Sequence, residues 1–407
     1  MTRAAASLAG ILRYGGLCLA ALILGACAQT AGTSTATGGA IRSAPQPDTA
    51  VSFDPNGRVQ VALLAPTGSS NENWEAIGQS VARAARLAVD DLTGAEIDLR
   101  IYPTQVTAAG TAAATQRAIS EGAKLIVGPV RSAMVGAASP AAAAAGIPIL
   151  TLSNNTAIAG NGVYTVGLTF EDSARRVMGY ASRRGIRRIG VVHSNDAAGN
   201  AGRAAASKTG APAGATIVTS AGYERSTSGI SSAAPGFVAS MKGAAVDGVL
   251  MTDTGSGLIF ASSFLPYYGL DTDVVKIMGL QDLGTPQVQA ERALRGAWYA
   301  APDPELEAIF SERYAARYGT EPHQLAGIAY DALAAAGALL REARASGDRS
   351  AFSARNLTAP QGFAGVNGPF KFLSDGTVER GLAVMEVTEN GPRVLDPAPG
   401  RFTFTGS

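Results

Sequence analysis

The sequence predicts an α/β fold built from two doubly wound parallel-sheet lobes. Short apolar runs alternate with helical stretches from Arg58 onward, which is the pattern of consecutive βαβ units. This alternation restarts after about residue 169, which indicates a second lobe of the same kind. The length beyond Arg58 is about 350 residues, too many for one ordinary hydrophobic core and suitable for two.

The first 26 residues have the pattern of an export signal. Arg3 and Arg13 precede an apolar run that is too short to cross a bilayer as a permanent helix. The run ends in Leu24-Gly25-Ala26-Cys27, which resembles the lipobox of bacterial lipoproteins, where the cysteine receives the lipid. An ordinary cleaved signal followed by an unrelated cysteine fits the same residues. We predict a signal peptide over 1–26, lipidation at Cys27 and a periplasmic protein anchored to the cell envelope.

Residues 27–57 are expected to form a flexible linker behind the lipidated cysteine. From Ala28 to about Asp54 the chain is almost entirely Ala, Thr, Ser, Gly, Gln and Pro, a composition that cannot bury a core. Ala28 is not the acidic residue associated with retention at the inner membrane, so this resemblance favours the outer membrane.

The elements of both lobes follow from the apolar runs and helical periods. In the first lobe, strands are expected over 59–65, 97–102, 125–127, 147–152 and 163–166, with helices over 77–91, 111–121 and 132–145. In the second, a helix over 173–184 precedes strands over 188–192, 216–219, 248–252 and 275–280. After a short run at 297–299, helices over 304–318 and 324–346 should return to the first lobe. A hairpin is expected to join 370–372 to 382–387 through the turn at Asp375-Gly376.

Composition and motifs argue against several classes of function. The chain has 33 Lys and Arg against 32 Asp and Glu, whereas nucleic-acid binders normally carry a basic excess. Cys18 leaves with the signal and Cys27 takes the lipid, so no disulfide or cysteine metal site is expected. His193 and His323 lack a zinc-site spacing, and neither a phosphate loop nor a nucleophile elbow occurs. We therefore predict no enzyme, no cofactor and no metal.

Two segments resemble the leucine/isoleucine/valine-binding protein family. They read Leu125-Ile126-Val127-Gly128-Pro129-Val130-Arg131-Ser132 and Gly146-Ile147-Pro148-Ile149-Leu150-Thr151-Leu152-Ser153. The resemblance covers about 58–399 and implies the type I periplasmic binding fold, in which a three-strand hinge joins two lobes around a ligand cleft. It places 58–168 and 302–363 in lobe 1, and 169–301 and 364–403 in lobe 2. In open parallel sheets, ligands bind beyond the carboxyl ends of the strands.

The same resemblance implies the ligand-binding residues. In that family a serine after the Gly-Pro turn and the loop after the next strand hold the ligand carboxylate, and a second-lobe acid holds the ammonium. Ser132 matches the serine, where a helix start favours an anion but also favours an N-cap. The loop candidates are Ser153, Asn154, Asn155 and Thr156, of which the asparagines also suit turns. The second-lobe candidates, each after a predicted strand, are Asp196, Asp253 and Asp282.

Two departures from the transport members point to another branch of the fold. The loop at 153–157 differs from theirs, and Ala198-Gly199 replaces an aromatic-glycine pair. The run 164–175 resembles the C-terminal domain of penicillin-binding-protein activators, which are envelope lipoproteins. Our leading hypothesis is a solute-binding lipoprotein that captures a small polar or amino-acid-like ligand for an inner-membrane ABC permease. The alternative is an activator whose partner is a peptidoglycan synthase.

Overall fold

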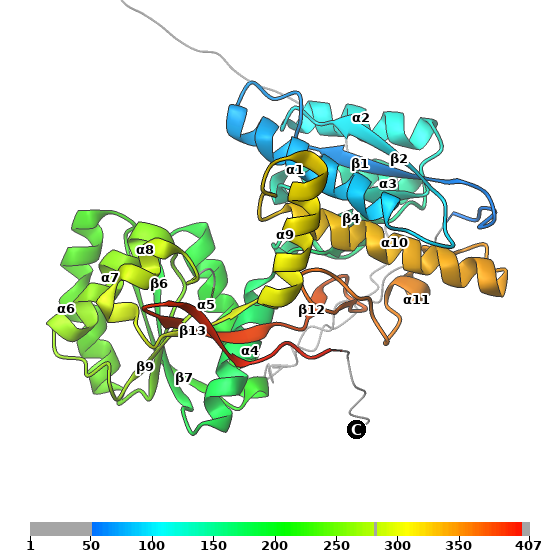
Figure 1. Ribbon diagram of the computed structural model, residues 1–407. Helices are drawn as coiled ribbons and strands as arrows, with labels where there is room; N and C mark the ends of the chain where they lie inside the picture. The colour runs from blue at the N-terminus through cyan, green and yellow to red at the C-terminus, as the bar shows by residue number, and fades with distance from the viewer. Residues whose placement is uncertain (1–50, 281–282, 401–407) are drawn as a thin grey trace, which may run out of the picture. The chain divides into compact units, whose positions relative to one another are not determined.

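The computed structural model describes residues 51–280 and 283–400 and contains two main sheets (Figure 1). The first sheet is parallel throughout and has the order β2-β1-β3-β4-β5. Its strands are β1 (Val59–Ala65), β2 (Ile97–Pro103), β3 (Leu125–Val127), β4 (Ile149–Thr151) and β5 (Val163–Thr165). The predicted parallel sheet of the first lobe is confirmed.

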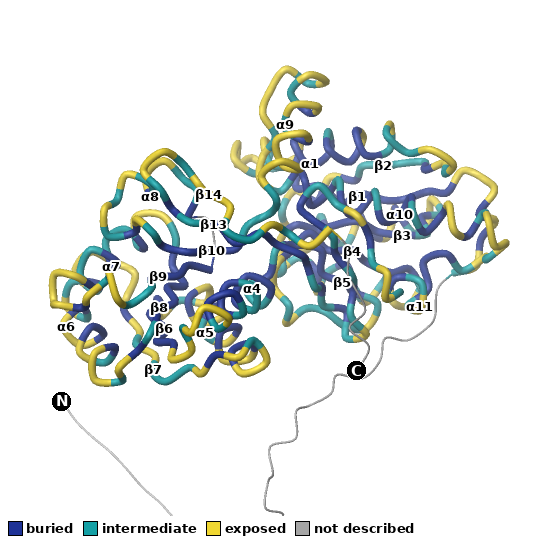
Figure 2. Tube along the Cα trace, turned by 60° about the horizontal axis from the view of Figure 1, so that its bottom comes forward, coloured by how far each residue is buried: buried dark blue, intermediate teal, exposed yellow. Residues whose placement is uncertain are grey.

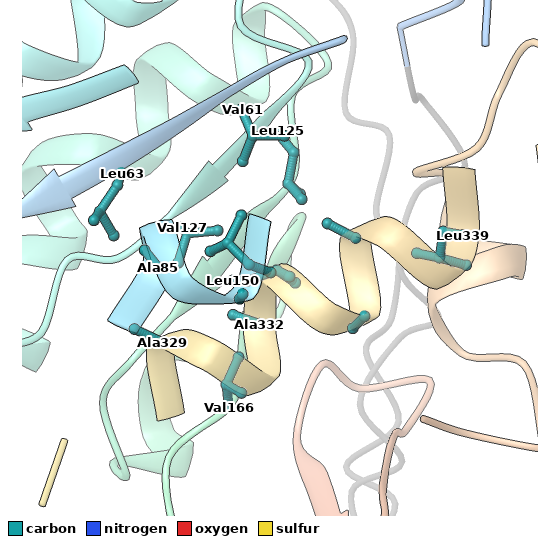
Figure 3. Packing of buried hydrophobic residues seen from close by; sticks show 14 of the residues in the cluster. Val61, Leu63, Ala85, Leu125, Val127, Leu150, Val166, Ala329, Ala332 and Leu339 are labelled. Atoms are coloured by element: carbon teal, nitrogen blue, oxygen red, sulfur yellow. The ribbon is translucent and has the colours of Figure 1, made fainter. Parts of the chain in front are cut away.

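The strand β1 is buried along its whole length because helices cover both faces of this sheet. Val61 and Leu63 point toward helices α1 and α10, whereas Ala62 and Leu64 point toward α2 and α3. Figure 3 shows the first of these two layers, in which β1 and β3 meet Ala85 and Ala329. The helices of the lobe are α1 (Glu72–Asp90), α2 (Ala108–Ser120), α3 (Ser132–Ala144), the short η1 (Thr156–Ile158), α9 (Pro304–Tyr318), α10 (Ala326–Ser346) and α11 (Ala354–Leu357).

The second sheet has the order β14-β13-β10-β9-β8-β6-β7, and five of its strands run parallel. These are β6 (Arg188–Ser194), β7 (Thr216–Tyr223), β8 (Gly248–Met251), β9 (Lys276–Gly279) and β10 (Trp298–Ala301). The antiparallel edge consists of β13 (Ala383–Thr388) and β14 (Gly391–Asp396). The second lobe is therefore doubly wound, with an antiparallel edge that the sequence pattern did not predict.

The faces of the second sheet are covered by two pairs of helices. Val249 and Met251 of β8 pack against α6 and α7, and Leu250 between them packs against α4 and α5. Dark strands in Figure 2 mark the buried core between these layers. The helices are α4 (Phe170–Arg183), α5 (Ala197–Gly210), η2 (Ala211–Ala213), α6 (Thr227–Gly243), α7 (Gly255–Tyr267), α8 (Pro286–Ala290) and η3 (Arg292–Leu294). No helix within the described ranges combines the length and apolarity needed to cross a membrane.

The terminal hairpin differs from the predicted one. Phe370–Phe372 (β11) pairs with Val378–Arg380 (β12), not with the later strand, which joins the second sheet as β13. Phe370, Phe372 and Val378 lie in the core of the first lobe, so the predicted lobe boundary at residue 364 is wrong. The aromatic side chains decide this, because Phe372 packs against Tyr164 of β5 with ring centroids 5.4 Å apart. The chain enters the second lobe for the last time after Arg380.

The packed part of the chain begins before the predicted end of the linker. Phe53 is buried in the first core, its ring lies 5.5 Å from that of Phe352, and its N–H donates to the carbonyl of Arg349. Arg344 donates to the carbonyls of Pro55, Asn56 and Gly57. Residues 53–57 therefore belong to the first lobe and not to a flexible linker, because one aromatic side chain and three carbonyl contacts fix them.

Candidate functional site

The first candidate surface lies where β3 leads into α3. Ser132 is the first helical residue, and the N-cap position belongs to Arg131, whose side chain makes no capping bond. The interpretation of Ser132 as N-cap is therefore wrong. Within the described part of the chain, nothing accepts a hydrogen bond from the backbone N–H of Ser132 or Ala133. Free N–H groups at the positive end of a helix favour an anion.

The turn before α3 fixes where this helix begins. Gly128 has φ of +90°, and a Cβ added there would lie 2.6 Å from the carbonyl oxygen of Leu64, so only glycine fits. The hydroxyl of Thr151, at the end of β4, donates to the carbonyl of Pro129 at 2.8 Å. This bond ties the loop after β3 to the loop after β4, which holds both at the same edge of the sheet.

The residue directly before these N–H groups carries a positive charge. The Arg131 guanidinium lies 5.3 Å from the ring centroid of Trp74, in the first turn of α1. Arg131 is exposed, and no carboxylate among the described residues forms a salt bridge with it. The ring holds the guanidinium by a cation–π contact without neutralising its charge. The pair was not predicted from the sequence, because Arg131 and Trp74 lie far apart along the chain.

The loop after β4 is held mainly by its own hydrogen bonds. Ser153 is buried and its hydroxyl accepts from the N–H of Asn155 at 3.1 Å. Asn155 caps η1 by accepting from Ala157, as a turn residue would, and the Thr156 hydroxyl donates to Glu171 at 2.8 Å. Asn154 is exposed. Of the four loop candidates, Asn154 has the side chain best placed to meet a solute.

Asp196 of the second lobe is committed to helix α5. Its carboxylate accepts from the N–H of Gly199 at 2.8 Å and from the Ser194 hydroxyl at 3.0 Å. The Gly199 hydrogen bond is the main reason why the pKa of Asp196 lies below its ordinary value. A Cβ at position 199 would lie 2.1 Å from the Ser194 carbonyl oxygen. The Ala198-Gly199 pair therefore serves the cap and brings no ring to this edge.

Asp253 is surrounded by internal donors. It follows β8, and its side chain is only 3% exposed. The Tyr223 hydroxyl donates to one carboxylate oxygen at 2.8 Å, while the Thr254 N–H donates to the other, also at 2.8 Å. The Arg225 guanidinium lies 2.7 Å from that second oxygen. Burial, and after it the hydrogen bond to Asp253, raises the pKa of Tyr223.

Arg225 is the site residue that sequence analysis missed. Besides its contact with Asp253 it lies 3.7 Å from Asp196, so one guanidinium serves both candidate carboxylates. Its side chain remains 46% exposed. The strand β7 extends to Tyr223, four residues beyond its predicted end, and a polar Glu224-Arg225 pair directly after a strand was the available signal. The order β8-β6-β7 brings these ends together.

Two predicted residues lie outside the described residues, namely Asp282 and Cys27. The described residues place Ser132, Ser153 and Asn154 at strand ends of the first lobe, and Asp196 and Asp253 at strand ends of the second. Chemically, the first edge offers N–H donors and a cation, and the second offers a half-exposed guanidinium above a buried acid.

Solved structures with the same fold come from several bacteria. A protein described as a branched-chain amino acid ABC transporter from Rhodospirillum rubrum has 17% identity and a TM-score of 0.68, covering 83% of this chain and 100% of that one. A transporter substrate-binding protein from Desulfitobacterium hafniense in complex with Leu has 17% identity and a TM-score of 0.59 over 83% and 100%. A solute-binding protein from Rhodopseudomonas palustris with 3,4-dihydroxybenzoic acid has 19% identity and a TM-score of 0.57 over 85% and 97%.

None of the curated proteins matches this sequence. The likeness to the solved structures supports the fold, which is the type I arrangement of two mainly parallel sheets. The family is shown by the sequence itself. Residues 58–392 match the family model described as periplasmic binding protein, whose members bind ligands without catalysis, and the chain belongs to that family.

Proposed function

We propose that this protein is the solute-binding component of an ABC importer and captures a small carboxylate between the strand ends of its two lobes. The observation that carries the proposal is the uncapped start of α3, where two backbone N–H groups have no acceptor among the described residues and the preceding Arg131 forms no salt bridge there. Family membership and the printed ligands of the similar proteins, Leu and 3,4-dihydroxybenzoic acid, support the same class of solute. Both ligands carry a carboxylate.

The mechanism follows from the two strand edges. A carboxylate bound at the start of α3 gains charge-assisted hydrogen bonds and the helix dipole. A ligand that also contacts the second lobe binds the closed arrangement more tightly than the open one, and this difference in affinity drives closure. An importer then distinguishes loaded from empty protein by that closure. No bond in the ligand is made or broken.

The direct test is thermal unfolding of the whole chain after bound solute has been stripped by reversible denaturation. At a hundred times its Kd, a ligand adds about 2.7 kcal/mol to the free energy of unfolding. For about 350 ordered residues this raises the midpoint by about 4 °C. The panel should contain aliphatic and aromatic carboxylates, amino acids and peptidoglycan fragments. A carboxylate that shifts the midpoint supports the proposal, and a panel without any shift contradicts it.

A matched pair of variants tests the site at α3. Ser132→Pro removes the backbone N–H at the first helical position, where proline is well tolerated, and Arg131 already has the extended backbone that a following proline requires. Ser132→Ala removes only the hydroxyl and keeps the N–H. We expect carboxylate affinity to fall about tenfold or more in Ser132→Pro, because a charged hydrogen bond is lost. Equal affinity in the two variants would argue against the N–H groups as ligands.

We also propose export to the periplasm and acylation at Cys27, on the basis of the family and the Leu24-Gly25-Ala26-Cys27 run. Stable attachment requires more than one acyl chain. Labelled palmitate should enter the wild-type protein and not Cys27→Ser, and the variant should move from the membrane to the soluble fraction. Sucrose-gradient separation of inner and outer membranes assigns the final location. Equal labelling of both proteins would contradict the lipid anchor.

The second candidate function is regulation of peptidoglycan synthesis. The residues 164–175 motivate it, together with the internal pairing of Asp196 and Asp253, which leaves these acids little room for an amino-acid ligand. This function predicts a flat ligand panel and recovery of a peptidoglycan synthase when the tagged chain is purified from crosslinked envelopes. Recovery of permease subunits without a synthase would support the importer instead.

A further inference from the structure

We propose that Arg225 is a built-in counter-ion that replaces the ammonium group of a ligand, so that the protein prefers carboxylates without an amino group. This inference rests on the proposed solute-binding function and names the class of solute. It starts from a contrast between the two strand edges. One edge presents an uncompensated cation, and the other presents acids that already have a cationic partner within the protein.

Asp253 cannot receive a ligand ammonium group. Its side chain is 3% exposed, and both of its oxygens accept hydrogen bonds, one from Tyr223 and the other from Thr254. The second oxygen also forms an ion pair with Arg225 at 2.7 Å. A Cβ at Gly257 would lie 2.5 Å from one of these oxygens, so the first turn of α7 also closes around the carboxylate. A ligand would have to displace the Arg225 guanidinium to reach Asp253, and the buried carboxylate strongly opposes that loss.

Asp196 is engaged in the same way, although it is more exposed. One oxygen accepts from Gly199 and Ser194, and the other faces Arg225 at 3.7 Å. The carboxylate also lies at the N-terminus of the 14-residue helix α5, where the dipole stabilises its charge. An ammonium group at this carboxylate would compete with the helix cap and with Arg225 together.

The acids at the strand ends of the first lobe are held by internal donors. None of the three residues that follow β1, β2, β3, β4 or β5 is Asp or Glu. Two acids reach these ends from helices: Glu75 accepts from the N–H of Gly68 after β1 at 2.7 Å, and Glu171 accepts from the hydroxyl of Thr156 after β4 at 2.8 Å. Directly before α3, the Arg131 cation lies on Trp74. An ammonium group that is buried without a hydrogen-bond acceptor loses its hydration, which costs several kcal/mol of binding free energy. The described residues therefore favour a carboxylate ligand and disfavour its amino analogue.

The experiment compares ligands that differ only in the amino group. The pairs are leucine with 4-methylpentanoate and phenylalanine with 3-phenylpropanoate, each titrated calorimetrically into the stripped whole chain. We expect the carboxylate of at least one pair to bind ten or more times more tightly than its amino acid. A pair in which the amino acid binds equally or more tightly overturns the inference but leaves the solute-binding function intact. No binding by any of the four compounds, together with a thermal panel without any shift, overturns both.

Variants of the second-lobe cluster assign the preference to Arg225. Arg225→Gln exposes the charges of Asp196 and Asp253 to the ligand, so the affinity for the amino acid should rise. The ratio of carboxylate affinity to amino-acid affinity should therefore fall at least tenfold. The double variant Arg225→Gln with Asp253→Asn removes one of the uncovered charges and should lose most of that gain. Circular dichroism and a cooperative thermal unfolding transition establish that the variants are folded. An unchanged preference in folded Arg225→Gln overturns the assignment.

Two further acids provide the competing explanation. Glu224 is exposed and accepts from Asn195, and Asp282 follows β9 outside the described residues. If either of them received a ligand ammonium group, the wild-type protein would bind leucine and lose that binding in Glu224→Gln or Asp282→Asn. That result would contradict the role of Arg225. Unchanged ligand affinities in both variants agree with it.

Discussion

The ion pair between Asp331 and Arg380 allows a sharp test of what holds the first lobe together. Both side chains are fully buried, and the guanidinium lies 2.7 Å from the carboxylate. Arg380 also donates to the carbonyls of Val166 and Gly368 at 2.9 and 3.2 Å. Because residues 166 and 380 each precede a crossover to the second lobe, this one side chain joins two connecting segments to α10. Its removal leaves a buried carboxylate without a cation.

We expect Arg380→Met to lower the free energy of unfolding by about 3–5 kcal/mol, the range for a buried pair that loses one partner. The remaining donors to Asp331 are the N–H of Val366 and the side chain of Asn367, both uncharged. With an unfolding entropy of about 0.7 kcal/mol per kelvin for 350 residues, the midpoint should fall by about 4–7 °C. Differential scanning calorimetry at pH 7 measures this shift.

Arg393→Met is the matched control, since Arg393 lies on the exposed edge strand β14, pairs with Glu386 and has a side chain that is 66% exposed. Its loss should cost less than about 1 kcal/mol. Adding Asp331→Asn to Arg380→Met should recover part of the loss, because the unpaired charge disappears. Equal midpoints for Arg380→Met and Arg393→Met would refute the argument that burial sets the cost.

Three other substitutions test separate parts of the fold by the same calorimetry. Phe53→Ala should destabilise the protein by about 3–5 kcal/mol because it empties a core position, whereas the exposed Val394→Ala should change stability by less than about 0.5 kcal/mol. Gly128→Ala should cost about 2 kcal/mol or more through its positive φ and its approach to Leu64. Asp196→Ala should cost about 1 kcal/mol at pH 7 by loss of the α5 cap. Because the pKa of Asp196 is lowered in the folded state, the difference in the free energy of unfolding between wild type and Asp196→Ala should persist above about pH 4 and vanish as the pH falls further. A constant difference down to about pH 2 would contradict the ionic cap.

Much of the fold could be predicted because its signals are local. Six of the seven residues of β1 are apolar and all seven are buried, as expected for a strand covered on both faces. The restart of the alternation after residue 169 marked the second lobe, since each βαβ unit repeats the same pattern. The strand pairing was predicted wrongly where two successive segments of the chain could each have been the partner strand. The Asp375-Gly376 turn was recognised, but the strand that it pairs was misjudged, because 382–387 is as strand-like as Val378–Arg380.

The candidate site was predicted less well, because its residues are partners in space and not neighbours along the chain. Strand ends could be read from the sequence, and they led to Ser132, Asp196 and Asp253 at the expected edges. The sequence could not indicate that Asp253 accepts from Tyr223, 30 positions earlier, or that Arg225 serves two carboxylates. Those contacts depend on the order of strands in the sheet.

The sequence by itself determined the family, the two lobes and the strand ends that carry the candidate binding residues. Apolar periodicity and motif order carry that information, because they act over a few residues at a time. The tertiary structure alone decided which charges remain available at those ends. Strand order β8-β6-β7 sets Arg225 between two aspartates, whereas Arg131 lies on Trp74 and forms no salt bridge among the described residues. Electrostatic pairing depends on distance in space, and the fold brings together residues that are far apart along the sequence.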